Sequence, residues 1–371
     1  TYKAVPKVEV HMEEKGYLEG AIPYPPEDIS TYRQKGWWLD LAFGDVLDRA
    51  VNWHPHKTAV LDQGTSLSYS ELQERVDRFA LELLRLGVKK YDRILLQMPN
   101  RHEFLIAFYG MHRIGAVPVL AVPRHGVREI SHFIRITDPI GWILPVRDGK
   151  REFESLVKEV DPQAKGVKWM ITVGDGGEVL PNTISMANLA ANGPIHEKNR
   201  HELKKHRPDP NDVAMILLTG GTTGMPKGVP RTHNSYLTNI RHTNADSRPD
   251  DIKALATPIG HSMAHQGPVG GSIFYGATLC LIPVPRSKAI LEAIQRYRIT
   301  TLGLVPTQLE DILNEPELGH YDLSSLRKVG TAGAALRPET MEQAETFFSK
   351  WGAEFVGGGF GSSEGPCASH R

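Results

Sequence analysis

The 371-residue sequence is poor in cysteine and has no excess of charge of either sign. Its two cysteines, Cys280 and Cys367, are far apart and show no CxxC or metal-ligand spacing, which argues against a disulfide framework or a zinc site. The 43 basic and 43 acidic residues balance and form no basic arm, so nucleic acid and anionic membranes are disfavoured as partners. A small-molecule ligand is therefore favoured.

Long apolar runs are also lacking. No stretch reaches the ~18 apolar residues of a membrane span, and the N-terminal segment TYKAVPKVEVHMEEKG holds no apolar core of signal-peptide length. The few cysteines fit a reducing compartment, so we expect a cytoplasmic protein. A chain of this length is too long for one ordinary core, which predicts two or more packed units.

The order of patterns along the chain predicts an α/β fold. Residues 1–40 are rich in proline, aromatic residues and charge, and predict an extended arm. After it, short apolar runs alternate with helical periodicity, which predicts mostly parallel, doubly covered sheets in two lobes, residues 41–190 and 191–371. The apolar runs are Arg93–Met98, Val117–Val122, Trp142–Leu144, Trp169–Val173, Val213–Leu218, Lys253–Thr257, Thr278–Ile282, Thr301–Val305, Arg327–Gly330 and Glu354–Val356. The charged run HEKNRHELKKHRPDP near the lobe boundary predicts a surface crossing with a solvated face.

The segment Ile216–His233, ILLTGGTTGMPKGVPRTH, carries the most chemical information. An apolar strand ends there at a loop of glycines, threonines and one lysine, whose backbone can approach an anionic group closely. A Walker A loop is excluded because Pro226 precedes Lys227 and Gly228 follows it. The dinucleotide fingerprint GxGxxG is absent from the loop, and the near match that starts at Gly359 lacks its third glycine. What remains is a loop that wraps the phosphates of a nucleotide, with a plain glycine turn as the structural alternative.

The pattern TGGTTGMPKG, followed by VPRTH, resembles the phosphate loop of the acyl-adenylate-forming enzymes, the superfamily of acyl-CoA synthetases, adenylation domains and luciferases. Three further stretches, ATPIGHSMAHQG, TAGAAL and FGSSEG, match the family in the same order. The resemblance implies an ATP site assembled from all four. The residues that it assigns to the nucleotide are Thr219, Gly220, Gly221, Thr222, Thr223, Gly224, Lys227, Gly333, Ala334, Gly361, Ser362 and Ser363.

The resemblance also implies individual roles. Lys227 would neutralise phosphate charge, and Glu364 would hold Mg²⁺, since a hard cation prefers carboxylate and nucleotide oxygens. His261 would act at the acid pocket. The residues that line this pocket would be His261, Ser262, Gly267 and Gly333. His261 and His265 are four residues apart, but no HExxH glutamate or third ligand is near, so a metal pair is disfavoured and His265 is expected to be structural.

The segments YRQKGWWLDLAFGDVLDRA, LQMPNRHEFLIAFYGMHRIGAVPVLAVPRHGVREISHF and GFGSSEGPCASHR resemble the aryl-acid branch, especially 2,3-dihydroxybenzoate-AMP ligases, and the likeness runs from about Tyr32 to Arg371. In that branch an asparagine that reads the 2-hydroxyl follows the pocket histidine, whereas Ser262 follows His261 here. Gly267 stands where the branch has a small hydroxyl or thiol residue. A pocket without these partners discriminates weakly for an ortho hydroxyl.

We therefore expect ATP-dependent activation of a benzoate-like, cyclic or other compact carboxylic acid to an acyl-adenylate, with release of pyrophosphate and then thioester formation with coenzyme A. The alternative is an aryl-acid-AMP ligase of the 2,3-dihydroxybenzoate or salicylate type that loads a carrier protein in siderophore biosynthesis. A non-catalytic nucleotide-binding module and an oxidoreductase are weaker alternatives. The resemblance implies that the protein uses ATP, Mg²⁺ and coenzyme A, and it is compatible with a homodimer. It also implies a small C-terminal domain with a catalytic lysine, which is not contained in residues 1–371.

Overall fold

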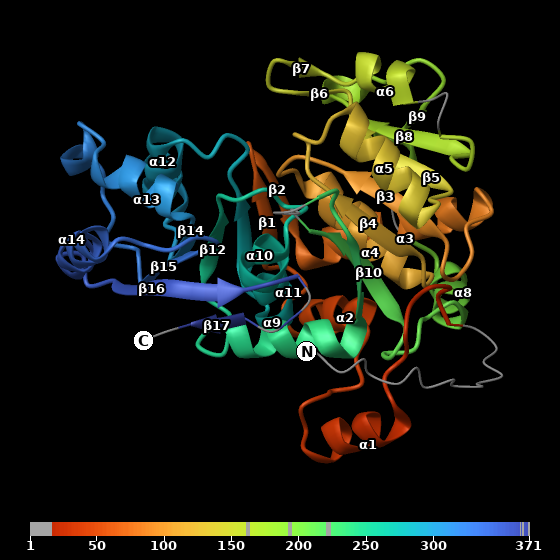
Figure 1. Cartoon of the computed structure of the whole chain (residues 1–371), viewed down its shortest axis with the longest axis horizontal. Coiled ribbons are helices and arrows are strands. Elements are labelled where there is room, and N and C mark those ends of the chain that lie inside the picture. The colour runs from red at the N-terminus through yellow and green to blue at the C-terminus, as the bar shows by residue number, and fades with distance from the viewer. Residues whose placement is uncertain are drawn as a thin grey trace, which may run out of the picture.

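The computed structural model describes residues 17–160, 164–191, 195–219, 224–363, 365 and 367–369. Their strands form two large sheets and one small ribbon (Figure 1). The strand order is β17-β16-β15-β14-β12-β13-β1-β2 in the eight-stranded sheet and β11-β10-β4-β3-β5-β8-β9 in the seven-stranded sheet. Among these residues, no helix combines the length and the apolar character needed to span a membrane.

Both large sheets are mostly parallel, which confirms the predicted α/β class. The eight-stranded sheet consists of β1 (Thr58–Asp62), β2 (Thr65–Ser68), β12 (Ile252–Leu255), β13 (Thr278–Leu281), β14 (Thr301–Leu304), β15 (Lys328–Ala332), β16 (Glu354–Gly361) and β17 (Cys367–Ser369). The seven-stranded sheet consists of β3 (Arg93–Gln97), β4 (Val117–Ala121), β5 (Gly141–Pro145), β8 (Trp169–Val173), β9 (Ile184–Ser185), β10 (Val213–Leu218) and β11 (Gly228–Thr232). β2, β11 and β17 pair antiparallel at sheet edges, and β6 (Arg147–Asp148) pairs with β7 (Arg151–Glu152) in the ribbon.

Helices cover both faces of each sheet. The helices are α1 (Pro26–Gln34), α2 (Phe43–Trp53), α3 (Tyr69–Arg85), α4 (His102–Arg113), α5 (Val127–Thr137), α6 (Glu154–Val160), α7 (Met186–Leu189), α8 (Glu197–Lys205), α9 (His233–Thr243), α10 (Ser262–Ala264), α11 (Gly270–Tyr275), α12 (Ser287–Tyr297), α13 (Pro306–Leu313) and α14 (Pro338–Ser349). Short turns are η2 (Asp175–Gly177), the π-helical η3 (His265–Val269) and η4 (Leu318–His320).

Three apolar cores lie between these layers of helices and sheets. The central core contains buried residues of α2, α3, α4, α9 and α11 and lies between the two sheets. A second core joins α12, α13 and α14 to the other face of the eight-stranded sheet, and a third joins α5 and α6 to the other face of the seven-stranded sheet (Figure 1). Successive strand residues alternate between cores, as Leu279 and Cys280 do, because side chains of a strand point to opposite faces.

The strands are not divided between the sheets at residue 190, where the sequence predicted a lobe boundary. β1 and β2, from the predicted first lobe, extend the eight-stranded sheet, where β1 pairs parallel with β13. β10 and β11, from the predicted second lobe, complete the seven-stranded sheet, where β10 pairs parallel with β4. The chain therefore crosses between the sheets more than once, and the hairpin that carries the glycine loop belongs to the seven-stranded sheet.

Two segments expected to be irregular contain helices. The described part of the predicted extended arm, residues 17–40, includes α1, which Pro26 favours because the first N–H of a helix has no intrahelical partner. The charged crossing includes α8, and it is more than a solvated face. Arg207 forms an ion pair with Asp48 at 2.7 Å, and Arg200 lies 3.7 Å from the buried Asp77, so the crossing is tied to α2 and α3.

Candidate functional site

Three of the predicted site stretches lie at one edge of the eight-stranded sheet. β12, β14, β15 and β16 are parallel neighbours, so their carboxyl ends meet at the same edge. His261 follows β12, Gly333 and Ala334 follow β15, and Gly361–Ser363 lie at the end of β16. Ligands of open α/β sheets bind at such an edge, outside the carboxyl ends of the strands.

The base of the glycine loop is held by short backbone contacts. The Thr219 N–H donates to the Lys227 carbonyl at 3.0 Å, and the Lys227 N–H donates to Thr219 Oγ1 at 3.1 Å. His132 of α5 donates its Nε2–H to the Pro226 carbonyl at 2.7 Å. The Lys227 side chain and Gly224 are exposed, so the lysine is free to meet a ligand. Residues 220–223, with the predicted phosphate ligands Gly220, Gly221, Thr222 and Thr223, lie outside the described residues.

Arg231 connects the glycine hairpin to the FGSSEG stretch, 132 positions further along the chain. It lies on β11, is 8% exposed, and donates from Nη1 to the carbonyls of Ser363 at 2.9 Å and Gly365 at 3.5 Å. Asn239 of α9 also donates to the Gly365 carbonyl, at 3.4 Å. The predicted metal ligand Glu364 stands between these two carbonyls in sequence, but it lies outside the described residues.

No role was expected for Arg231 from the sequence, although the residue is part of VPRTH. The only signal was its place four residues after Lys227, because the contact with Ser363 depends on how two distant strands are brought together. Its guanidinium also lies 5.2 Å from the centroid of the Tyr236 ring, which favours a fixed orientation. Arg231 is therefore a described side chain that links the glycine hairpin to the FGSSEG stretch.

His261 marks the start of α10 beside the TAGAAL turn. Its side chain is exposed, and Nδ1 accepts the Met263 N–H at 3.3 Å. Partial desolvation and the nearby charge of Arg124 lower the pKa of the imidazole. A Cβ added to Gly333 would stand 3.9 Å from Met263 Sδ, and Gly333 has a φ of +93°, which glycine adopts without strain. The predicted pocket residues His261, Ser262 and Gly333 are thus neighbours.

The turn after α10 contains His265 and Gly267. His265 is 1% exposed, its ring centroid lies 4.8 Å from that of Phe108, and burial lowers its pKa to about 3. A buried neutral imidazole against aromatic rings fits the structural role expected for it. Gly267 has open space where a Cβ would stand, and it lines a cavity whose opposite wall is formed by residues of β12, β14 and β15.

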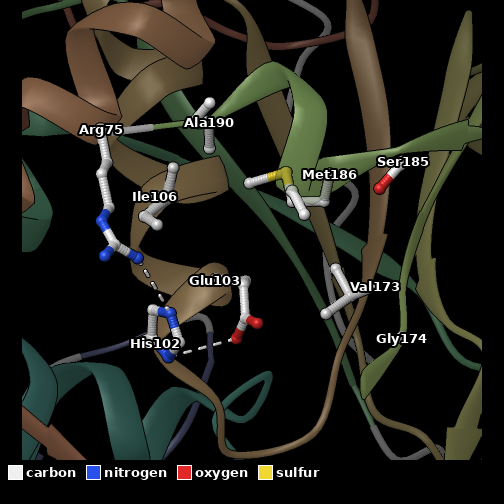
Figure 2. Close-up of a pocket in the computed structure, with 11 residues that line it drawn as sticks. Arg75, His102, Glu103, Ile106, Val173, Gly174, Ser185, Met186 and Ala190 are labelled. Carbon is white, nitrogen blue, oxygen red and sulfur yellow. Dashed lines mark hydrogen bonds and ion pairs between the residues drawn. The ribbon is translucent and has the colours of Figure 1, made fainter. Parts of the chain in front are cut away.

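A separate pocket of about 180 Å³ lies between α4 and the β8–α7 segment, as Figure 2 shows. His102 Nδ1 lies 2.8 Å from Asp62 Oδ2 and 3.4 Å from Glu103, so these three residues can surround a cation. However, Glu103 is paired with Arg101 at 3.0 Å, Arg75 lies 3.5 Å from His102 Nε2, and guanidinium groups repel a metal. Asp62 also accepts the His102 backbone N–H at 2.9 Å, so the group fits a cap of α4 better than a metal centre.

Known proteins resemble this chain in sequence and in fold. A model of the AMP-binding enzyme family matches residues 47–370. The salicyl-AMP ligase / salicyl-S-ArCP synthetase of Mycobacterium tuberculosis is 31% identical over 358 residues, which cover 94% of this chain and 61% of the relative. The 2,3-dihydroxybenzoate-AMP ligase of Bacillus subtilis is 30% identical over 335 residues, which cover 89% of this chain and 60% of the relative. The apo structure of Mycobacterium smegmatis MbtA superposes with a TM-score of 0.81 at 28% identity, covering 95% of this chain and 62% of MbtA. The chain thus spans about 60% of the length of the curated relatives it matches.

Proposed function

The chain belongs to the AMP-binding enzyme family, and from that premise we propose that it forms the ATP- and acid-binding part of an aryl-acid-AMP ligase. In this reaction the carboxylate of the acid attacks the α-phosphorus of ATP and pyrophosphate leaves. The observation that carries the proposal is the contact of Arg231 with Ser363 and Gly365, which joins the phosphate loop to the FGSSEG stretch. Two motifs that the family uses for one nucleotide are thereby held together.

The chemistry asks the protein mainly for charge neutralisation and in-line positioning. Lys227 is exposed at the base of the loop and would neutralise phosphate charge. The Mg²⁺ assigned to Glu364 would supply further neutralisation, since carboxylate oxygens are ligands that a hard cation prefers. His261, exposed beside Gly333 and with a lowered pKa, would present a neutral imidazole to the acid.

The substrate we propose is an aryl acid. This proposal is narrower than the expectation from the sequence, which also included cyclic and other compact carboxylic acids. The two curated relatives described above are named for salicylate and 2,3-dihydroxybenzoate, and they support this choice. Ser262 and Gly267 replace the groups that would read an ortho hydroxyl, so we propose that the 2-hydroxyl is dispensable for this protein.

The acceptor we propose is the thiol of a carrier protein, since the relative from Mycobacterium tuberculosis carries that activity in its name. Coenzyme A is the second candidate for the acceptor. The sheet edge at the carboxyl ends of the strands is exposed, so it does not select between a small and a large molecule that carries the thiol. A role in siderophore biosynthesis, which the resemblance of the sequence implies, is part of the proposal and does not come from the geometry of the chain.

A panel of aryl acids tests the proposal in the natural protein. Acid-dependent exchange of pyrophosphate into ATP measures adenylation, and thioester formation with an aryl carrier protein or with coenzyme A then identifies the acceptor. We expect exchange with benzoate at a rate comparable to that with salicylate. Exchange with aliphatic acids and none with aryl acids would overturn the substrate assignment, and faster transfer to coenzyme A would overturn the acceptor.

A further inference from the structure

A cavity of about 180 Å³ lies between the inner face of the eight-stranded sheet and the turn that contains Gly267. The end of α9 and the loop after it form one wall, and β12, β14 and β15 form the other. Its lining includes Asn244, Ser247, Lys253, Gly267, Gly303 and Gly330. Gly267 is also one of the residues that the resemblance assigns to the acid pocket, while Lys253, Thr301 and Lys328 of the lining lie toward the amino ends of the strands.

Two glycines keep this cavity open. Gly303 and Gly330 are direct partners in the β14–β15 register. Leu302 and Val329 point into the core beneath α12–α14, so the glycines face the opposite side, toward α9. A Cβ on Gly303 would meet no atom within 4 Å, and one on Gly330 would meet only the Val356 carbonyl, at 3.7 Å. The space between the strands and the Gly267 turn is therefore unfilled.

Lys253 lies at the base of the cavity, on the same face of the sheet. It is 6% exposed, and its Nζ donates to Asn244 Oδ1 at 2.9 Å and to Ser247 Oγ at 2.6 Å. An ammonium has three N–H groups, so these two neutral acceptors leave one donor available. Among the described residues, no carboxylate lies within 4.0 Å of Nζ in an ion pair.

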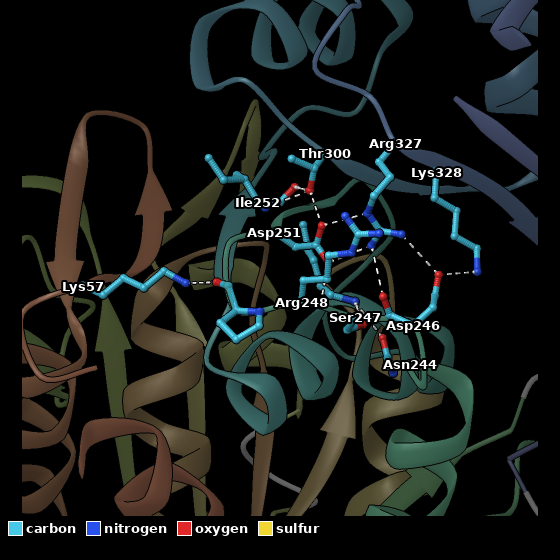
Figure 3. A network of polar contacts seen from close by, with 12 residues as sticks. Lys57, Asn244, Asp246, Ser247, Arg248, Asp251, Ile252, Thr300, Arg327 and Lys328 are labelled. Carbon is cyan, nitrogen blue, oxygen red and sulfur yellow. Dashed lines mark hydrogen bonds and ion pairs between the residues drawn. The ribbon is translucent and has the colours of Figure 1, made fainter. Parts of the chain in front are cut away.

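The nearby carboxylates are occupied by other cations, as Figure 3 shows. Asp251 accepts from Arg327 at 2.8 Å and from Thr300 at 2.8 Å, and Asp246 accepts from Lys328 at 2.9 Å. Lys253, Arg327 and Lys328 thus outnumber Asp246 and Asp251 by one positive charge. A buried cation without a counterion in contact is costly, and an anionic ligand would offset this cost.

We propose that this cavity is the far end of the acid pocket and that Lys253 binds an anionic oxygen of the substrate remote from the carboxylate that is activated. The inference rests on the proposed function and deepens it, since it narrows the substrate to an aryl acid with a second anionic group. In such a complex the free N–H of Lys253 donates to that oxygen, while Asn244 and Ser247 hold the ammonium in place.

The test compares benzene-1,4-dicarboxylate with benzoate in the natural protein and in Lys253→Met. Binding is measured by calorimetry and activation by pyrophosphate exchange. A charge-assisted hydrogen bond in a buried site corresponds to about 10- to 100-fold in affinity. We expect the dicarboxylate to bind about 10-fold or more tightly than benzoate, and Lys253→Met to lose this preference while benzoate binding changes less than about 2-fold.

The possible results distinguish the binding of a second anionic group by Lys253 from the proposed adenylation reaction. Equal loss for both acids would mean that Lys253 only supports the fold, and an unchanged preference would mean that the second carboxylate lies elsewhere; either result overturns the inference. Binding of the dicarboxylate that depends on Lys253 without any pyrophosphate exchange would support the inference and overturn the proposed adenylation. If Lys253→Met does not fold, Gly303→Val fills the cavity from a strand position where a β-branched residue is tolerated, and it should weaken the dicarboxylate selectively.

Discussion

Replacement of Arg231 by methionine removes the contact that joins the glycine hairpin to the FGSSEG stretch while it keeps an unbranched side chain. The strong bond is the one to the Ser363 carbonyl at 2.9 Å; the contact with Gly365 at 3.5 Å is weak. One hydrogen bond from a charged donor contributes about 1.5–3 kcal/mol, and Arg231 is buried, so solvent does not replace it. If the FGSSEG stretch is positioned by this bond, ATP affinity falls by about 10- to 100-fold.

Calorimetric titration with MgATP measures this loss directly. Arg241→Met is the matched control, because Arg241 donates to the Gly36 carbonyl at the same distance of 2.9 Å but in an exposed contact outside the glycine loop. We expect wild-type affinity in the control and the full loss in Arg231→Met, with both variants folded by circular dichroism. Wild-type ATP affinity in a folded Arg231→Met protein would refute the assignment of this contact to the nucleotide site.

Three further predictions concern charge and pocket chemistry. Lys227→Ala should lower the rate of pyrophosphate exchange by about 100-fold, because it removes a charged donor to the phosphates; Lys57→Ala, at a lysine outside the site, serves as the control, and equal rates would remove Lys227 from the mechanism. Ser262→Asn should raise activation of salicylate relative to benzoate, and an unchanged ratio in a carboxylic-acid panel would mean that the pocket is misplaced. Burial holds the pKa of His112 at about 4 and that of His265 at about 3, below the ordinary 6.5, so the unfolded chain binds more protons below pH 6.5. Below pH 6.5 the free energy of unfolding should therefore fall by about 1.4 kcal/mol per pH unit for each histidine, until the pH reaches the pKa of the folded protein. Urea unfolding at pH 7 and pH 5 measures this fall, and His265→Phe should make the dependence of the free energy of unfolding on pH less steep. A urea midpoint that does not change with pH would contradict the prediction.

Much of the fold could be predicted because its signals are local. A run such as Val213–Leu218 is long, apolar and bounded by glycine, and the structure has β10 over the same residues. The order of strands within a sheet is not local. β1 joins β13 across more than 200 residues, and nothing in Thr58–Asp62 itself specifies that partner.

The candidate site could be proposed from the sequence only where its groups lie in short motifs. Thr219 and Lys227 form the base of the loop, and Gly333 follows a strand, as the resemblance implied. Arg231 and Lys253 were missed because their importance comes from what surrounds them. The sequence did contain one signal for Lys253. It interrupts the apolar run of a predicted strand at a position that the fold buries.

The central claim is that the glycine loop and the FGSSEG stretch form one ATP site that activates an aryl acid. The most direct measurement is the product formed when the natural protein is incubated with MgATP and benzoate and then analysed by mass spectrometry. We expect benzoyl-AMP and pyrophosphate in equal amounts. Formation of ADP and phosphate, or ATP binding without any benzoyl-AMP over a panel of aryl acids, would contradict it.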